Sequence, residues 1–141
     1  METALPHVTT VKEIDRVLAA EEDRVVILRF SAYEDDAFCQ RLDRVLRRAA
    51  AYVRRFGVVY AVDLTHVPEC SERWGVSETA PFAVQFFFRS RHMRVDCGTG
   101  DHDQLTGVVP SVRDMVDMTE LVYRQARRGK GLAALPRDIR R

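Results

Sequence analysis

The sequence predicts an α/β fold in which a central mixed four-stranded sheet carries helices on both faces. Two nearly continuous apolar runs, Arg24–Phe30 and Val58–Asp63, flank a segment with helical periodicity. Runs of this kind are typical of strands buried on both faces of a sheet. A third apolar run, Phe82–Phe88, is followed after a short turn by an alternating segment, Met93–Cys97, which indicates an antiparallel hairpin.

A capping box marks the first helix. Thr10 and Glu13 have the spacing at which a hydroxyl and a carboxylate each bind a backbone N–H group that the first turn leaves unpaired. Apolar residues then follow on one helical face: Val11, Ile14, Val17 and Leu18. The acidic run 21–23 ends this pattern before the first strand.

A second helix is predicted between the first two strands. Its apolar positions recur at helical spacing, with arginines largely on the other faces: Leu42, Val45, Leu46, Ala49, Val53 and Phe56 against Arg41, Arg44, Arg48 and Arg55. We expect Gly57 to end this helix. Strand, helix and strand within residues 24–63 form a βαβ unit, so the two strands should be parallel, with a right-handed crossover.

The remaining helices are short or terminal. Pro68 opens a short helix that ends near Gly75. Ser111 begins a second capping box, and one apolar face follows it: Val112, Met115, Val116, Thr119, Val122, Tyr123 and Ala126. Gly129 should end this helix, so we expect a domain over residues 1–129 and a basic C-terminal tail over residues 130–141.

This order of elements, αβαβαββα, is that of the thioredoxin fold. Pro81, just before the third strand, stands about where thioredoxins place a cis proline. The sequence leaves both the cis and the trans form open, with trans the usual state of a turn proline.

The composition points to a soluble globular protein, with 46% apolar and 30% charged residues. No apolar run approaches the roughly 18 residues of a membrane span. The first residues, Met1–His7, have neither a basic region nor an apolar stretch, so we expect a cytosolic or nuclear protein and not a secreted one. Three widely separated cysteines, Cys39, Cys70 and Cys97, form no disulfide framework.

The charge is distributed unevenly along the chain. Residues 1–120 carry 15 basic and 20 acidic groups, whereas residues 121–141 carry seven basic groups and one acidic group. A basic end of this kind favours acidic partners, either protein or nucleic acid. A solvated tail after arginines that stabilise a helix C-terminus explains the same pattern, and both interpretations stay open.

Cys39 begins the second helix, where a redox thioredoxin holds its attacking thiolate. Redox chemistry also needs a resolving thiol or an electropositive setting, and Glu34, Asp35 and Asp36 oppose a thiolate. We therefore expect an inert cysteine, and a monothiol oxidoreductase using Cys39 is the alternative function.

Other candidate sites are weak. The histidines and cysteines lack the short spacings of zinc sites, so we expect no metal and no cofactor. Residues 96–103 fit neither a calcium loop nor a phosphate-binding turn and read as a flexible turn. Phe86–Phe88 are predicted to lie in the core and not to form a face that stacks on RNA bases. Trp74 is either an anchor for a partner or the lid of its helix.

Three stretches go beyond a generic fold, and two short ones support them. The first stretch is residues 21–26 with Arg29 and Phe30, and the second is residues 86–89 with His92 and residues 96–100. The third stretch comprises residues 115–117, 122–124 and 126–132. The two short stretches are residues 5–7 and 62–68. In these stretches the chain closely resembles the Dim-type thioredoxin-like proteins of the U5 small nuclear ribonucleoprotein (U5 snRNP), over nearly its whole length.

This resemblance implies a non-enzymatic pre-mRNA splicing factor in the nucleus. It implies a protein-interaction subunit of the U5 snRNP and the U4/U6.U5 tri-snRNP, bound by spliceosomal proteins, with snRNA contact left open. We expect no membrane or small-molecule ligand, and a monomer outside the particle. Six residues of the second and third stretches are the candidate partner-binding residues: Arg89, His92, Arg124, Arg127, Arg128 and Lys130.

The chain departs from the family pattern at three places. Glu34–Ala37 stands where the family usually carries Trp-Asp-Pro, and Gln125 stands where relatives have glycine. Phe82 occupies the position of a second cysteine that the family often has, so a disulfide between Cys39 and that position cannot form.

Overall fold

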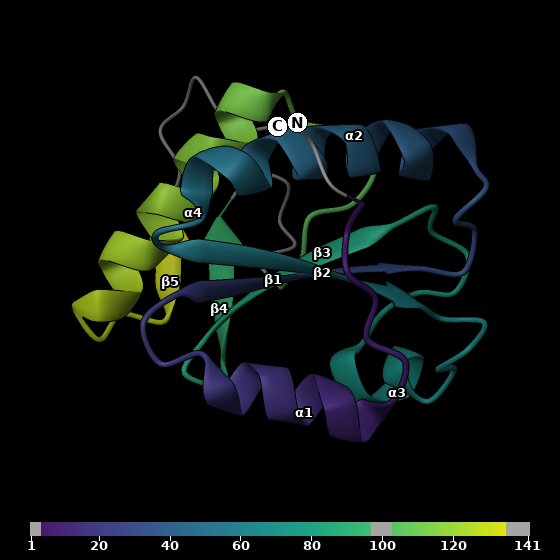
Figure 1. The fold of residues 1–141 in the computed structure, drawn as a ribbon, viewed down its shortest axis with the longest axis horizontal. Coiled ribbons are helices and arrows are strands. Elements are labelled where there is room, and N and C mark those ends of the chain that lie inside the picture. The colour runs from purple at the N-terminus through teal and green to yellow at the C-terminus, as the bar shows by residue number, and fades with distance from the viewer. Residues whose placement is uncertain (1–3, 97–102, 135–141) are drawn as a thin grey trace.

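A five-stranded mixed sheet lies between two layers of helices in the computed structural model, which describes residues 4–96 and 103–134 (Figure 1). The helices are α1 (Val11–Ala20), α2 (Ala37–Val53), α3 (Cys70–Trp74) and α4 (Val112–Arg127). The strands are β1 (Val25–Ser31), β2 (Gly57–Asp63), β3 (Ala83–Phe88), β4 (Arg91–Asp96) and β5 (Leu132–Ala134). Helices α1 and α3 cover one face and α2 and α4 the other, which confirms the predicted architecture.

The strands run in the order β2-β1-β3-β4-β5. β1 pairs in parallel with β2, as the predicted βαβ unit requires, and places Val25 opposite Gly57. β1 is antiparallel to β3, and β3 is antiparallel to β4, where Phe87 lies opposite His92. The predicted hairpin is therefore confirmed.

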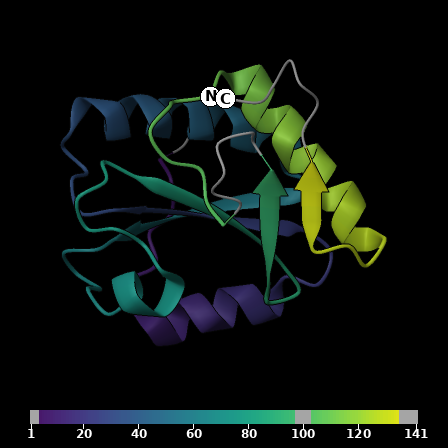
Figure 2. The same ribbon diagram turned by 180° about the vertical axis from the view of Figure 1, so that it is seen from behind.

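The fifth strand differs from the sequence prediction. Residues from 130 onward are predicted to form a tail, but Leu132–Ala134 pairs in parallel with β4 (Figure 2). Ala133 is fully buried, and the N–H group of Arg94 donates to the carbonyl oxygen of Gly131 over 2.8 Å. Three residues are too few to show a strand pattern, and their partner lies far away in the sequence. Residues 135–141 are outside the described part of the chain.

The N-cap hydrogen bond of each predicted capping box is present. The hydroxyl of Thr10 accepts from the N–H of Glu13 at 3.0 Å, and the carboxylate of Glu13 accepts from the N–H of Thr9 at 2.9 Å. Ser111 accepts from the N–H of Asp114 at 3.0 Å. These contacts satisfy N–H groups that have no partner within the helix.

Gly57 does not end α2, contrary to the sequence prediction. α2 ends at Val53, and Gly57 is the first residue of β2. A Cβ atom at this position would lie 2.9 Å from Cγ2 of Thr119 and 3.1 Å from Cγ2 of Val53. Glycine is therefore needed because α2, β2 and α4 approach closely here.

The core has two parts, one on each face of the sheet. Phe86 and Phe88 belong to the part under α2 and α4, whereas Phe87 belongs to the part under α1 and α3. All three rings are buried, so the core interpretation of this run is confirmed. Trp74 is half-buried, and its ring centroid lies 6.0 Å from that of Phe30.

The peptide bonds of the described residues, including the one before Pro81, are all trans. Within those residues, no helix is both long and apolar enough to cross a membrane. The same residues contain no group of three or more His, Cys, Asp or Glu side chains that could hold a metal ion.

Candidate partner-binding sites

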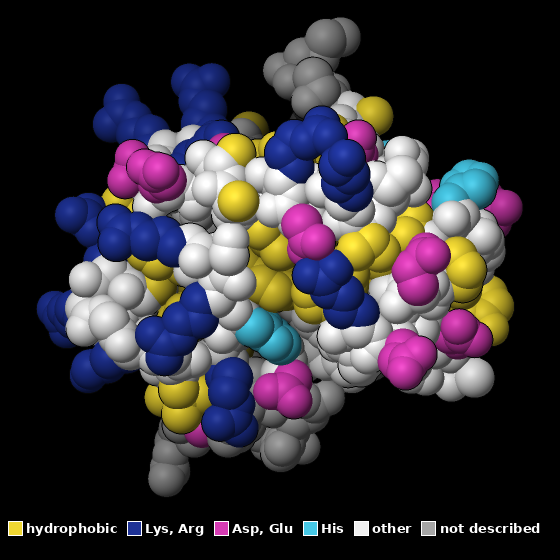
Figure 3. Space-filling model, turned by 90° about the horizontal axis from the view of Figure 1, so that it is seen from below, with side chains coloured by type: hydrophobic (Ala, Val, Ile, Leu, Met, Phe, Trp, Pro, Cys, Tyr) yellow, Lys and Arg dark blue, Asp and Glu magenta, His cyan; other side chains and the backbone are white. Residues whose placement is uncertain are grey.

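On the face that Figure 3 shows, basic and acidic side chains gather toward opposite ends. Figure 3 shows Lys and Arg side chains over its left end and more of the Asp and Glu side chains toward its right. The left end is the one at which α4 ends and the chain turns from β3 to β4 (Figure 1). The fold therefore places two basic segments, far apart in the sequence, at the same end.

Arg89 lies in the turn between β3 and β4, where it and Ser90 have positive φ angles of 52° and 67°. Its Nε donates to the carbonyl oxygen of Glu22 over 2.8 Å, and its guanidinium lies 5.0 Å from the ring centroid of Phe88. These contacts fix the turn against the loop between α1 and β1. Arg89 is nevertheless exposed, so part of its guanidinium faces solvent.

The end of α4 carries the other basic residues. Arg127 donates from Nη1 to the hydroxyl of Tyr123 over 2.9 Å. Arg124 lies 3.9 Å from the carboxylate of Glu120, a weak exposed pair one turn earlier. Arg128 and Lys130 are exposed just past the last turn. The helix dipole favours cations at this terminus, so part of the pattern serves helix stability.

Arg91 joins the two basic segments. Its Nη1 donates to the carbonyl oxygen of Gly129 over 3.4 Å. A small cavity of about 220 Å³ lies between this hairpin and the end of α4, lined by Phe88, Arg89, Arg91, Met93, Ala126 and Gly129. Sequence reasoning missed Arg91 as a site residue, because only the tertiary fold brings the turn to α4.

His92 does not join the basic end. Strand alternation turns its side chain to the opposite face of β4 from Met93, which is buried under α4. The His92 ring stacks on Phe87 with centroids 5.0 Å apart, and its Nε2 donates to the carbonyl oxygen of Asp103 over 2.7 Å. The predicted partner-binding residues thus fall into two separate sites.

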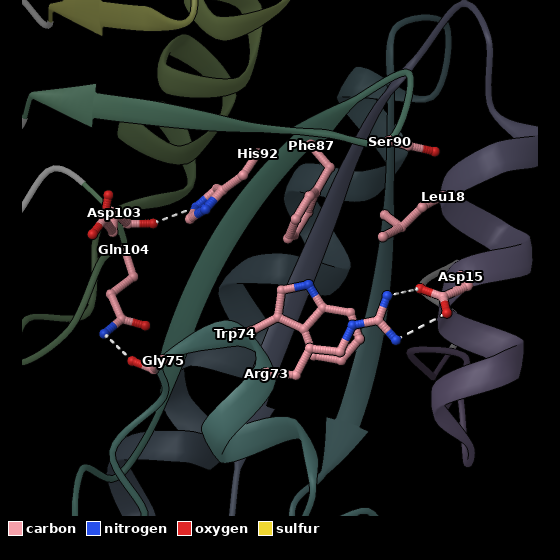
Figure 4. Close-up of a pocket in the computed structure, with 10 residues that line it drawn as sticks. All are labelled: Asp15, Leu18, Arg73, Trp74, Gly75, Phe87, Ser90, His92, Asp103 and Gln104. Atoms are coloured by element: carbon pink, nitrogen blue, oxygen red, sulfur yellow. Dashed lines mark hydrogen bonds and ion pairs between the residues drawn. The ribbon is translucent and has the colours of Figure 1, made fainter.

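The second site is a groove of about 670 Å³ between α1, α3 and β4 (Figure 4). Trp74, Phe87 and His92 line it with aromatic surface. Arg73 lies 4.6 Å from the ring centroid of Trp74 and binds Asp15 through two hydrogen bonds of 2.6 and 2.9 Å. The groove therefore combines the aromatic side chains of Trp74 and His92 with polar and charged groups, whereas the ring of Phe87 lies almost fully buried beneath it.

Cys39 lies in the first turn of α2 and is fully buried. Burial raises the pKa of its thiol, and the nearby guanidinium of Arg29, which favours the thiolate, does not offset this effect. Arg29 itself is engaged by the carboxylates of Asp43, at 3.0 Å, and Glu34, at 2.7 Å. The site thus holds a protonated, inaccessible thiol.

Cys70 is buried as well, and burial raises its pKa to about 11. The third cysteine, Cys97, lies outside the described residues, as do His102 and most of the predicted turn over residues 96–103. Neither of the two described cysteines has the exposed, low-pKa thiol of a redox site.

Comparison with known proteins identifies the family. A family model described as "Mitosis protein DIM1" matches residues 4–139. The chain belongs to the DIM1 family. The resemblance inferred from the three sequence stretches is therefore confirmed.

Two relatives of the DIM1-family chain match over more than nine-tenths of their length. It is 37% identical over 134 residues to "Spliceosomal protein DIB1" of Eremothecium gossypii, covering 95% of this chain and 92% of the relative. It is 33% identical, with the same coverage, to "Mitosis protein dim1" of Schizosaccharomyces pombe. Thioredoxin from Plasmodium falciparum superposes with a TM-score of 0.63 at 18% identity, covering 80% of this chain and 97% of that one. The thioredoxin-like fold is thus confirmed.

Proposed function

We propose that this DIM1-family chain is a non-enzymatic pre-mRNA splicing factor, acting in the nucleus as a protein-interaction subunit of the U5 snRNP and the U4/U6.U5 tri-snRNP. The observation that carries the proposal is the family match over residues 4–139. A relative named as a spliceosomal protein aligns with 95% of the chain, so the likeness extends well beyond a shared fold.

The geometry supports a binding role and not redox catalysis. An attacking thiol must be accessible and must ionise near the working pH. Cys39 is fully buried, and its pKa is raised. The alternative of a monothiol oxidoreductase using Cys39 therefore has no support in the site.

The basic end is the proposed contact with the particle. Arg89, Arg127, Arg128 and Lys130 gather there with Arg91, around the end of α4. Such groups pair with acidic protein surface or RNA phosphate, and the attraction weakens as salt screens it. Arg124 adjoins this surface.

His92 belongs to the groove, which we assign to a spliceosomal protein partner. Its aromatic lining suits protein side chains, since aromatic residues dominate the energetics of protein interfaces. Outside the particle, the chain is proposed to be monomeric.

The direct test is co-purification from nuclear extract. Tagged protein should recover U5, U4 and U6 RNAs together with splicing proteins. Depletion of the protein should cause unspliced precursors to accumulate. Recovery of the tagged protein without any of these RNAs would refute the proposal.

A further inference from the structure

The outer face of α2 presents a row of arginines to solvent. Four arginines and one tyrosine share this face and are all exposed: Arg41, Arg44, Arg48, Tyr52 and Arg55, the last just past the helix end. The residues that α2 buries lie on its opposite side: Cys39, Leu42, Leu46, Ala49 and Val53. The arginine row therefore takes no part in the core, and Figure 1 shows α2 along the upper side of the sheet.

Helix α2 itself supplies few acidic side chains to balance the positive charge of this row. Residues 37–55 contain six arginines and one acid, Asp43, which pairs with the buried Arg29 of β1. Helix α4 is built differently, because its exposed face carries the acid–base pairs Arg113–Asp117 and Glu120–Arg124. Like charges three or four residues apart destabilise a helix, so a bound polyanion would offset repulsion between neighbouring arginines of this row.

Exposed aromatic rings accompany the arginines. Tyr52 is 73% exposed and Phe38 is 50% exposed, and both lie on α2. The guanidinium of Arg41 lies 5.7 Å from the ring centroid of Phe38. Fourteen residues separate the two rings, which corresponds to about 21 Å along a helix. Rings beside guanidinium groups are the combination that single-stranded nucleic acid uses, with bases stacked and phosphates paired.

We infer that the outer face of α2 binds single-stranded RNA, with Arg44, Arg48 and Arg55 on phosphates and Tyr52 stacked on a base. An acidic protein fits this face less well, because a protein interface needs an apolar centre, and here the exposed aromatic rings are spread along the row. The inference stands independently of the role in splicing and of the basic end around α4, and it can be tested with the purified chain.

The first test is fluorescence anisotropy of a labelled single-stranded uridine oligonucleotide across a salt series. The triple variant Arg44→Gln, Arg48→Gln and Arg55→Gln should bind at least tenfold more weakly. Loss of three phosphate contacts should also reduce the slope of log K against log salt by about 2. The matched control removes three exposed arginines elsewhere, Arg16→Gln, Arg94→Gln and Arg113→Gln, and should change the affinity less than threefold.

The second test separates RNA from an acidic protein. Tyr52→Ala leaves the charge unchanged and should weaken RNA binding about fivefold or more, because base stacking is lost. Polyglutamate of equal charge should compete poorly. Equal losses in the two triple variants, or efficient competition by polyglutamate with no effect of Tyr52→Ala, would overturn the inference. Circular dichroism verifies that each variant is folded. If the triple variant is not folded, the single variants Arg44→Gln and Arg55→Gln replace it.

Discussion

Arg29 on β1 and Asp43 on α2 form a buried ion pair, with Nε 3.0 Å from Oδ1 and Nη2 3.1 Å from Oδ2. The Arg29 side chain is only 1% exposed. A guanidinium buried to this extent is stable only when paired with opposite charge. Glu34 is the second carboxylate that pairs with Arg29. The pair thus ties β1 to α2.

Removing the charge of Asp43 should destabilise the protein. In Asp43→Asn the buried guanidinium keeps only Glu34, and we expect a loss of about 3 kcal/mol in the free energy of unfolding. Urea denaturation at pH 7 measures this loss of unfolding free energy. The control is Asp117→Asn, which breaks a 3.9 Å pair with the largely exposed Arg113 and should cost less than about 0.5 kcal/mol. Equal losses in the two variants would contradict this account.

Gly57 should not tolerate a methyl group. Gly57→Ala brings Cβ to 2.9 Å from Cγ2 of Thr119, and we expect the overpacking to cost about 1–3 kcal/mol. Thr119→Ser removes that methyl group and keeps the hydroxyl that donates to the carbonyl oxygen of Met115. In a double-mutant cycle by urea denaturation, the cost of Gly57→Ala should fall in the Thr119→Ser background. An unchanged cost would show that the contact is not its cause.

The described thiols should be unreactive in the native protein. Raised pKa values leave little thiolate at Cys39 or Cys70 near pH 7, and both side chains are buried. Because Cys97 lies outside the described residues, the measurement uses Cys97→Ser. We expect a disulfide reagent to label this variant slowly at pH 7 and rapidly in urea, with the native rate rising as pH increases above the ordinary thiol range. Fast labelling of one thiol at pH 7 would reopen the redox alternative.

Charge reversal at the end of α4 should weaken association with the particle. Arg127→Glu with Arg128→Glu places two acids at a terminus where cations are favoured, and it reverses the proposed contact. We expect recovery of U5 RNA with the tagged variant to fall most at low salt, and the difference from the wild type to shrink as salt is raised, because salt screens the contact that the wild type makes. The control is Arg16→Glu with Arg113→Glu, which makes the same charge change at exposed positions on α1 and α4. Equal recovery of U5 RNA with the wild type and both variants would show that the basic end is only solvated surface.

Local sequence signals predicted most of the fold. The capping boxes at Thr10 and Ser111, and the apolar runs of β1 and β3, each depend on residues close together in the chain. β5 escaped prediction because its three residues are a strand only by pairing with β4. Gly57 was misassigned because the same residue type serves helix ends and close approaches, and only the position of Thr119 distinguishes them.

The candidate site was predicted in part. The basic residues at the end of α4 were found from the charge distribution, but Arg91 and the separation of His92 depend on tertiary structure. Helical spacing already placed the arginines of α2 away from its apolar face, but they were not predicted as a site, because acidic residues elsewhere in the first 120 residues outweigh them in the net charge. The folded helix shows them exposed together in one row.

The most direct test of the central claim is rescue of splicing in extract depleted of the protein. Wild type and Cys39→Ala should both restore conversion of precursor to spliced RNA, because the proposed role needs binding and not the thiol. Circular dichroism should first establish that Cys39→Ala is folded. If the wild type restores no splicing, the role in the spliceosome is wrong. If the wild type restores splicing and folded Cys39→Ala does not, the protein acts through thiol chemistry and the non-enzymatic account is wrong.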